Sequence, residues 1–192
     1  MSLIFDAPIN NLSFGNVSVN ILRELHERKT KLSIFPKNEP DFSAFNDLSD
    51  EFKGWVQNAI DYRFHSLDKD TPSLNLWHLN GSEKRVSKNQ YLLTFYELDS
   101  PTFVEKKMVD LQDKVFISNP EAIEAFEKIG CSNIVFVPMG FDPDFKVTKS
   151  KSTVIEGKTH FILMGKFEKR KHTKNIIKAW LKKYGNNNKY LL

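Results

Sequence analysis

The sequence of 192 residues predicts an α/β fold with a doubly wound parallel sheet. Two observations support this prediction. Short apolar runs that end at proline or glycine turns have the length of buried strands. The longer stretches between them repeat their apolar residues at intervals of three and four, as amphipathic helices do. Strands that alternate with helices form βαβ units, and ligands of such sheets bind beyond the carboxyl ends of the strands.

The first half of the chain begins with a strand over Leu3–Ala7, which Pro8 ends. A helix is expected from about residue 16 to 28, with a glycine and several capping side chains near its start. A second strand over Leu32–Phe35 leads into a polar loop. The next helix, from about residue 50 to 64, has an apolar stripe at helical spacing that belongs to the core.

The second half continues this alternation. Four more strands are expected, at Leu74–Leu79, Gln90–Tyr96, Lys114–Ile117 and Ile134–Val137. One helix is expected to begin at Ser100-Pro101, in the usual order of a capping residue and a proline at the first helical position. The clearest helix lies between Ser118 and Gly130, because it has caps and a proline at its start and a glycine after its end.

A last strand over Phe161–Met164 is followed by Gly165 and a loop rich in lysine and arginine. A helix comes next, and Gly185 stands at its C-cap position. Its apolar face consists of Ile176, Ile177, Trp180, Leu181 and Tyr184. A glycine turn with cations before a helix N-terminus can bind an anion such as phosphate, because free backbone N–H groups and the helix dipole favour negative charge there. A basic surface loop explains these residues equally well at this point.

The net charge of +4 conceals an uneven distribution of charge. Residues 146–192 contain 13 Lys/Arg and 2 Asp/Glu, whereas residues 1–145 contain 15 Lys/Arg and 22 Asp/Glu. A basic segment joined to an acidic body indicates two functional parts. Either nucleic acid or a phosphorylated small molecule suits the basic part.

The sequence also restricts compartment and metal content. Cys131 is the single cysteine, so an internal disulfide is excluded and a reducing compartment is favoured. No apolar run has the length of a membrane span, and the first residues lack the pattern of a signal peptide. We therefore expect a cytoplasmic protein without a membrane span. The five histidines show no spacing typical of metal ligands, so no metal site is expected.

Four segments form an ordered set. They are YLLTFYELDS at 91–100, VFISNPEAIEAFEKIG at 115–130, NIVFVPMGFDPDF at 133–145 and FILMGKFEKRK at 161–171. In order and spacing they resemble the GT-B fold glycosyltransferases, specifically the family 4 (glycosyl transferase group 1) type. The resemblance covers residues 90–185, and residues 1–89 agree with it only in architecture.

The resemblance implies a Rossmann-like acceptor-side domain over residues 1–145 and a linker over residues 146–158. Residues 159–192 would be the first strand–helix unit of the donor-side, nucleotide-sugar domain. The rest of that second domain, with its Glu-x7-Glu motif, is missing, so the chain looks like a fragment or a truncated form. An incomplete second domain could also self-associate. Whether the chain is active by itself stays open.

The implied reaction is that of a hexosyl or other glycosyltransferase. It would transfer a sugar from a nucleoside-diphosphate sugar to a hydroxyl acceptor on a glycan, a lipid or a protein. No cofactor and no metal ion would be needed, because Lys166 and Lys171 would stabilise the leaving diphosphate. Lys166 stands where the family usually has Arg or Lys after a glycine, and Lys171 stands at the lysine of the family's Arg-Lys-Gly motif. Arg170 directly precedes Lys171. A glycine is common in the family where His172 stands here.

Three further site residues follow from the resemblance. Gly15 lies in the loop after the first strand, where the family has glycines near the donor phosphate. Glu97 stands close to the position of a frequent active-site histidine, at the end of the strand that finishes with Tyr96. His78 closes another strand on the same side. Glu97 and His78 are therefore the candidate catalytic residues, although a core or surface imidazole explains His78 as well.

Two other functions stay open. The basic segment could be a non-enzymatic nucleic-acid-binding module, but such modules interleave exposed aromatic residues with cations. Trp180 and Tyr184 fall on the apolar face of the expected helix, which argues against nucleic acid as a partner. An inert remnant is the third reading, because a lone strand and helix cannot form a core of their own.

Overall fold

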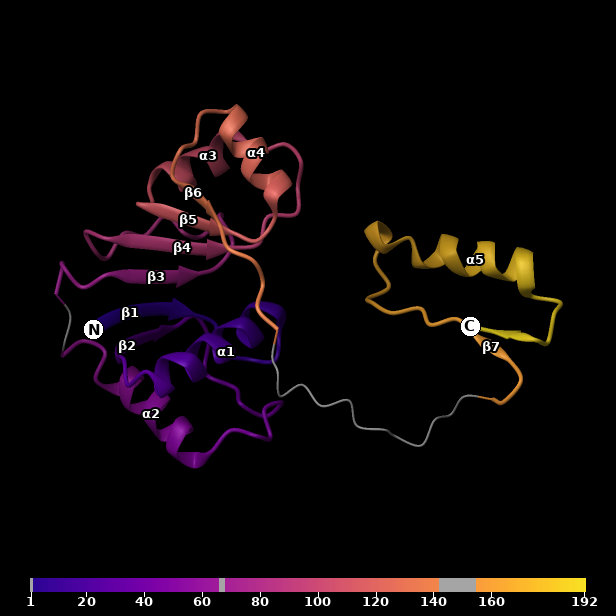
Figure 1. The fold of residues 1–192 in the computed structure, drawn as a ribbon, viewed down its shortest axis with the longest axis horizontal. Coiled ribbons are helices and arrows are strands. Elements are labelled where there is room, and N and C mark those ends of the chain that lie inside the picture. Colours follow the sequence, from indigo (N-terminus) through magenta and orange to yellow (C-terminus); the bar gives the residue numbers. More distant parts are fainter. Residues whose placement is uncertain (1, 66–67, 142–154) are drawn as a thin grey trace. The chain divides into compact units, whose positions relative to one another are not determined.

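The structure is a computed structural model, which describes residues 2–65, 68–141 and 155–192. The chain divides into two compact units, Met1–Pro143 (unit 1) and Asp144–Leu192 (unit 2), which Figure 1 shows. The predicted boundary at residue 145 and most of the predicted linker 146–158 lie outside the described residues. Asp142, which belongs to the segment NIVFVPMGFDPDF at 133–145, also lies outside them.

Unit 1 contains a six-stranded sheet in the order β2-β1-β3-β4-β5-β6, and every neighbouring pair is parallel. The strands are β1 (Ser2–Ala7), β2 (Lys31–Pro36), β3 (Ser73–Leu76), β4 (Gln90–Thr94), β5 (Lys114–Ile117) and β6 (Ile134–Phe136). The α/β class and the parallel sheet predicted from the sequence are confirmed. The arrangement is consistent with a Rossmann-like fold.

Four helices connect the strands of unit 1: α1 (Ser13–Glu27), α2 (Asp50–Asp61), α3 (Phe103–Asp110) and α4 (Pro120–Lys128). Local side chains explain where two of them begin. The Ser49 side chain accepts a hydrogen bond from the Phe52 backbone N–H at the start of α2, and Asn119 does the same for Glu121 at the start of α4. Gly130 follows α4 with φ of +85°, a conformation that favours glycine.

Several helices and strands begin or end at other residues than the sequence predicted. The cap of α3 is Thr102 and not Ser100, because Glu105 stands three residues after Thr102 and completes a capping box with it. Helix α1 begins at Ser13, three residues earlier than expected, and Gly15 lies inside it instead of in the preceding loop. Strand β3 ends at Leu76 instead of Leu79.

The helices cover a different face of the sheet in each half of unit 1. Side chains at alternate strand positions point to opposite faces. On the first face, residues of β1 to β3 such as Phe5, Ile34 and Leu76 pack against α1 and α2. On the second face, residues of β4 and β5 such as Leu92 and Val115 pack against α3 and α4. The second face of β2, β1 and β3 belongs to neither cluster.

Unit 2 contains a two-stranded parallel sheet of β7 (Thr159–His160) and β8 (Tyr190–Leu191), the short 3-10 helix η1 (Lys169–Lys171) and helix α5 (Thr173–Tyr184). The predicted buried strand over Phe161–Met164 is wrong. Phe161 donates one more backbone hydrogen bond to Leu191, and there the pairing ends, because β8 has only two residues. The side chains of Ile162 and Met164 are 81% and 84% exposed.

An aromatic cluster holds α5 to the strands of unit 2. The ring centroids of Phe161 and Tyr184 lie 5.2 Å apart, those of Tyr184 and Tyr190 4.5 Å apart, and Trp180 is 6.1 Å from Tyr184. Each of these side chains keeps part of its surface in solvent. Thr173 is the one buried residue in the described part of unit 2. The unit is therefore held by partly exposed rings instead of a closed apolar core.

Among the residues that the structure describes, no helix is both long enough and apolar enough to cross a membrane.

Candidate functional site

Gly15 is buried in the first turn of α1, where the chain that leaves β1 passes closely. A Cβ at this position would lie 2.2 Å from the backbone oxygen and from Oδ1 of Asn10. Ser18, one turn further, donates hydrogen bonds to the carbonyl oxygens of Pro8 and Gly15. Glycine is therefore required here by contact with the β1–α1 loop.

His78 lies two residues beyond the end of β3 and is exposed. Its ring packs edge-on against Phe14, with centroids 4.6 Å apart, and lies 5.4 Å from the ring of Trp77. Phe14 also contacts Phe95, which follows β4. The structure thus places His78 at the carboxyl edge of the sheet, beside the residue that precedes Gly15.

Glu97 is exposed and lies three residues beyond the end of β4, which is shorter than predicted. Its neighbour Tyr96 is buried, and the Tyr96 hydroxyl donates to Oε2 of Glu105 at 3.3 Å. Burial, and then the negative charge of Glu105, raise the pKa of Tyr96 to about 12. Glu97 is thus in water, whereas Tyr96 is part of the packing between β4 and α3.

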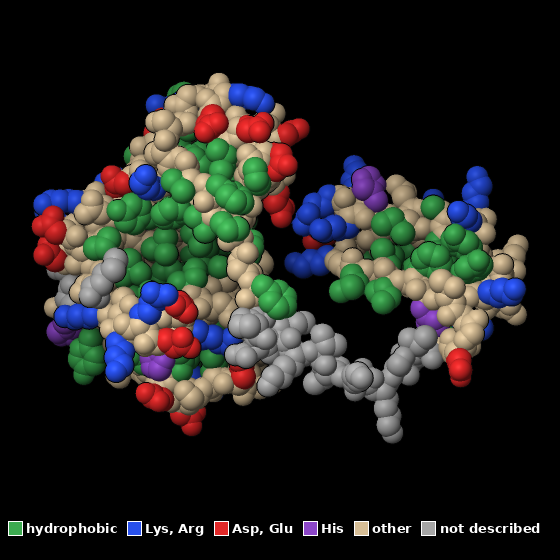
Figure 2. Space-filling view, viewed as in Figure 1, with side chains coloured by type: hydrophobic (Ala, Val, Ile, Leu, Met, Phe, Trp, Pro, Cys, Tyr) green, Lys and Arg blue, Asp and Glu red, His purple; other side chains and the backbone are tan. Residues whose placement is uncertain are grey.

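The three basic candidates of unit 2 lie in η1 or just before it. Lys166 follows Gly165, whose φ of +122° favours glycine, while Arg170 and Lys171 lie in η1 itself. All three are exposed. Arg170 pairs with Glu168, with Nε and Oε2 3.0 Å apart. Lys166 and Lys171 form no ion pair with the described residues, and Figure 2 shows Lys and Arg side chains gathered at this end of unit 2.

Helix α5 begins directly after these lysines. Its first turn contains no acidic residue, and its cap, His172, adopts a left-handed conformation with φ of +52° and makes no side-chain capping bond. No acidic side chain of this first turn therefore neutralises the positive end of the helix dipole. The lysines and the helix N-terminus together form an electropositive end of unit 2.

A pocket that the sequence did not reveal lies on the uncovered second face of the sheet in unit 1. Its volume is about 700 Å³. Polar residues at its wall come from the strands, the loop before β3 and the loop before β4, and they are Asp6, Lys37, Asp68, Lys69, Ser73, Asn75, Lys84 and Gln90. Apolar residues, among them Ile4, Phe35, Phe64 and Val86, form the rest.

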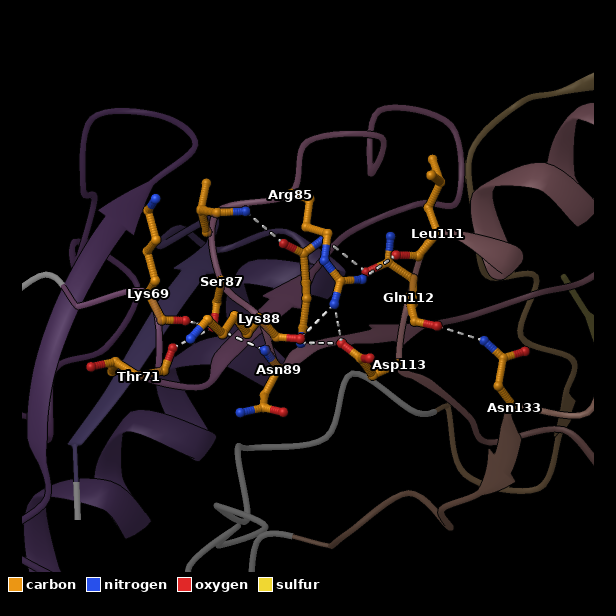
Figure 3. Close-up of polar contacts among 12 residues, drawn as sticks. Lys69, Thr71, Arg85, Ser87, Lys88, Asn89, Leu111, Gln112, Asp113 and Asn133 are labelled. Carbon is orange, nitrogen blue, oxygen red and sulfur yellow. Dashed lines mark hydrogen bonds and ion pairs between the residues drawn. The ribbon is translucent and has the colours of Figure 1, made fainter.

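The loop before β4 is fixed by the polar contacts drawn in Figure 3. Arg85 donates to the carbonyl oxygens of Leu111 and Lys88, and pairs with Asp113 at 2.7 Å. Ser87 donates to the carbonyl oxygens of Lys69 and Thr71, at 3.3 and 2.5 Å. These bonds tie the loop to the N-terminal ends of β3 and β5, so one wall of the pocket has a defined shape.

The sequence contains one signal of an uncovered sheet face, but it does not locate the pocket. Strands of a parallel sheet covered on both faces are almost continuously apolar. Here Asp6, Ser73, Asn75 and Gln90 interrupt three such strands, and the observed register pairs Asp6 with Asn75 and Ser73 with Gln90. They therefore lie on one face. The register joins residues far apart in the chain, so it could not be read from local patterns.

Within residues 2–65, 68–141 and 155–192, no three His, Cys, Asp or Glu side chains come together as metal ligands would. Comparisons of this chain with protein-family models, with curated proteins and with solved structures found no match.

Proposed function

We propose that this chain is a glycosyltransferase, or a part of one, that transfers a sugar from a nucleoside-diphosphate sugar to a hydroxyl acceptor. The observation that carries the proposal is the pair Lys166 and Lys171. Both are exposed, neither has an acidic partner among the described residues, and both precede the N-terminus of α5. The parallel α/β sheet of unit 1 is consistent with the proposed class of enzyme.

The chemistry follows from charge. Breaking the bond between the sugar and the diphosphate leaves negative charge on the diphosphate oxygens, and positively charged donors stabilise that charge. In this proposal Lys166, Lys171 and the first N–H groups of α5 bind the diphosphate. Arg170 contributes less, because Glu168 already neutralises it. His78 and Glu97 in unit 1 are the candidates that would bind or deprotonate the acceptor hydroxyl.

The same cations could also attract nucleic acid. Stacking on single-stranded bases requires exposed aromatic faces among the cations. Trp180 and Tyr184 instead pack with Phe161 and Tyr190. We therefore prefer a small diphosphate as the ligand of this end of unit 2. A cytoplasmic location is part of the proposal.

Equilibrium binding of UDP-, GDP- and ADP-glucose to the full chain tests this proposal. Loss of one charge-assisted phosphate contact costs about 1.5–3 kcal/mol, so Lys166→Ala and Lys171→Ala should each weaken binding by roughly 10- to 100-fold. Lys182→Ala is the matched control, because Lys182 lies in the last turn of the same helix. It should bind as the wild type does.

Two results would contradict the proposal. One is the absence of binding by all three nucleotide sugars. The other is equal weakening by all three lysine variants together with strongly salt-dependent binding of a single-stranded oligonucleotide, which would favour nucleic acid.

A further inference from the structure

We propose that the pocket of unit 1 binds a small amphipathic anion. The ligand has a flat apolar ring, at least one O–H or N–H donor, and a carboxylate or phosphate group. None of the candidate residues Lys166, Lys171, His78 and Glu97 belongs to the lining of this pocket. Ligand binding in the pocket therefore does not depend on the glycosyltransferase proposal.

Two buried oxygens of β3 carry the inference. Ser73 and Asn75 are 3% and 7% exposed, and both line the pocket. Ser73 Oγ and Asn75 Oδ1 have no hydrogen-bond partner among the described residues. Buried polar atoms are nearly always paired, and an unpaired acceptor lowers the stability of the free protein. A ligand that donates a hydrogen bond to Asn75 Oδ1 and pairs with the Ser73 hydroxyl would supply what these atoms lack.

Other polar groups nearby are already occupied. The Gln90 side chain donates to the Lys84 carbonyl and to Gln112 Oε1, and it accepts from the Val86 N–H. Lys37 pairs with Asp6 across 2.9 Å. The side chains of these residues therefore donate no hydrogen bond to Ser73 Oγ or Asn75 Oδ1.

An aromatic wall favours a ring. Phe35 and Phe64 both line the pocket and meet edge to face, with their centroids 5.4 Å apart. The Arg63 guanidinium lies 4.7 Å from the centre of the Phe64 ring. Ile4 and Val86 add aliphatic surface. A flat apolar ring fits such a lining better than a fully hydroxylated sugar does.

Charge at the wall favours an anion. Lys69 and Lys84 line the pocket, and neither forms an ion pair with a described residue. Neighbouring cations are paired: Lys88 with Asp70 and Arg85 with Asp113. Asp68, which also lines the pocket, accepts a hydrogen bond from the Asp70 N–H. With Asp6 and Lys37 neutralising each other, the lining keeps a surplus of one positive charge.

Hydrogen bonds hold the backbone of both lysines in place. The Lys69 carbonyl accepts from the Lys88 N–H and from the Ser87 hydroxyl, and the latter contact is drawn in Figure 3. The Lys84 carbonyl accepts from Gln90 Nε2 at 2.8 Å. A volume of about 700 Å³ is also ordinary for a small-molecule pocket, which spans roughly 300–1,000 Å³.

The test uses saturation-transfer NMR on the full chain with matched probes. 4-Hydroxyphenylacetate has an aromatic ring, a phenolic O–H donor and a carboxylate. Phenylacetate lacks the phenolic donor, and tyrosol lacks the negative charge. 4-Hydroxyphenyl phosphate and hydroquinone, which lacks the charge, are the corresponding pair for a phosphate. Wild-type protein should bind at least one complete probe ten times or more tightly than its incomplete partners. Lys69→Gln and Lys84→Gln should weaken only the charged probes.

Asn75→Leu and Ser73→Ala provide the decisive variants. Because each removes an unpaired buried oxygen, both should raise the melting temperature of the free chain while weakening probe binding at least tenfold. Ser82→Ala is the matched control, since Ser82 is equally buried but donates to the Leu79 carbonyl. It should lower the melting temperature and leave binding unchanged. The proposal is wrong if no probe binds, or if Asn75→Leu and Ser73→Ala lower the melting temperature without affecting binding.

Discussion

The Tyr96 hydroxyl donates a hydrogen bond to Oε2 of Glu105, 3.3 Å away, and both side chains are buried. The same carboxylate oxygen accepts from the backbone N–H and the hydroxyl of Thr102. Glu105 thus connects the end of β4 to the start of α3.

This contact predicts a loss of stability in alkaline solution. The pKa of Tyr96 is raised from 10 to about 12, so the folded chain keeps the phenolic proton after the unfolded chain has lost it. The contribution of protonated Tyr96 to the free energy of unfolding is therefore complete below pH 10 and is lost between pH 10 and 12. The loss is at most about 2–3 kcal/mol. Urea unfolding of wild type and Tyr96→Phe across this range measures it. The variant should lose less stability with rising pH; parallel curves would contradict the assignment.

The capping box of α3 predicts different costs for two neighbouring substitutions. Thr102→Ala removes the acceptor for the Glu105 N–H and a donor to its carboxylate, so it should cost about 1–2 kcal/mol of unfolding free energy. Ser100→Ala, at the cap position that the sequence suggested, should change stability by less than about 0.5 kcal/mol. Chemical denaturation compares them. Equal effects would show that Thr102 is not the cap.

Two helical glycines should respond in opposite directions to alanine. Gly15→Ala would place a methyl group 2.2 Å from the Asn10 oxygens, so the β1–α1 loop must shift, at a cost of about 1–3 kcal/mol. Gly54→Ala meets no atom within 4 Å in α2 and should gain roughly 0.5–1 kcal/mol. Melting temperatures of the two variants measure this. A neutral Gly15→Ala would mean that the loop is free to move.

Backbone protection should differ between the two units. Helix α4 packs through its own buried side chains Ala122 and Phe126, whereas α5 packs through partly exposed rings. Fewer buried apolar contacts make local opening easier. Amide hydrogens of α5 should therefore exchange at least ten times faster than those in the middle of α4. Hydrogen-exchange mass spectrometry resolves both segments, and equal protection would refute this expectation.

Much of the fold of unit 1 could be predicted because it depends on local pattern. All six strands and four helices of this unit were expected, and β5 has the predicted bounds. Failures occurred where a contact decides the outcome. The start of α3 depends on the capping box that Glu105 forms with Thr102. The length of β7 depends on its pairing with the short β8, which comes later in the chain.

The candidate residues divide in the same way. Lys166 and Lys171 could be proposed from the sequence, because they stand in a local pattern of glycine, cations and helix and match basic positions of the family that the chain resembles. Ser73 and Asn75 could not, because only the register of β1, β3 and β4 shows that these polar side chains share one uncovered face. Gly15 was expected beside a phosphate, and its close contact with Asn10 became visible only in the structure.

The measurement that tests the proposed function most directly is a titration of the ¹⁵N-labelled chain with UDP, GDP and ADP, followed amide by amide. We predict that one of these nucleotides shifts the signals from Lys166 to Asn175 saturably, and that Lys171→Ala abolishes the shifts while Lys182→Ala preserves them. Signals in this segment that stay unchanged with all three nucleotides would contradict the diphosphate site and, with it, the glycosyltransferase proposal.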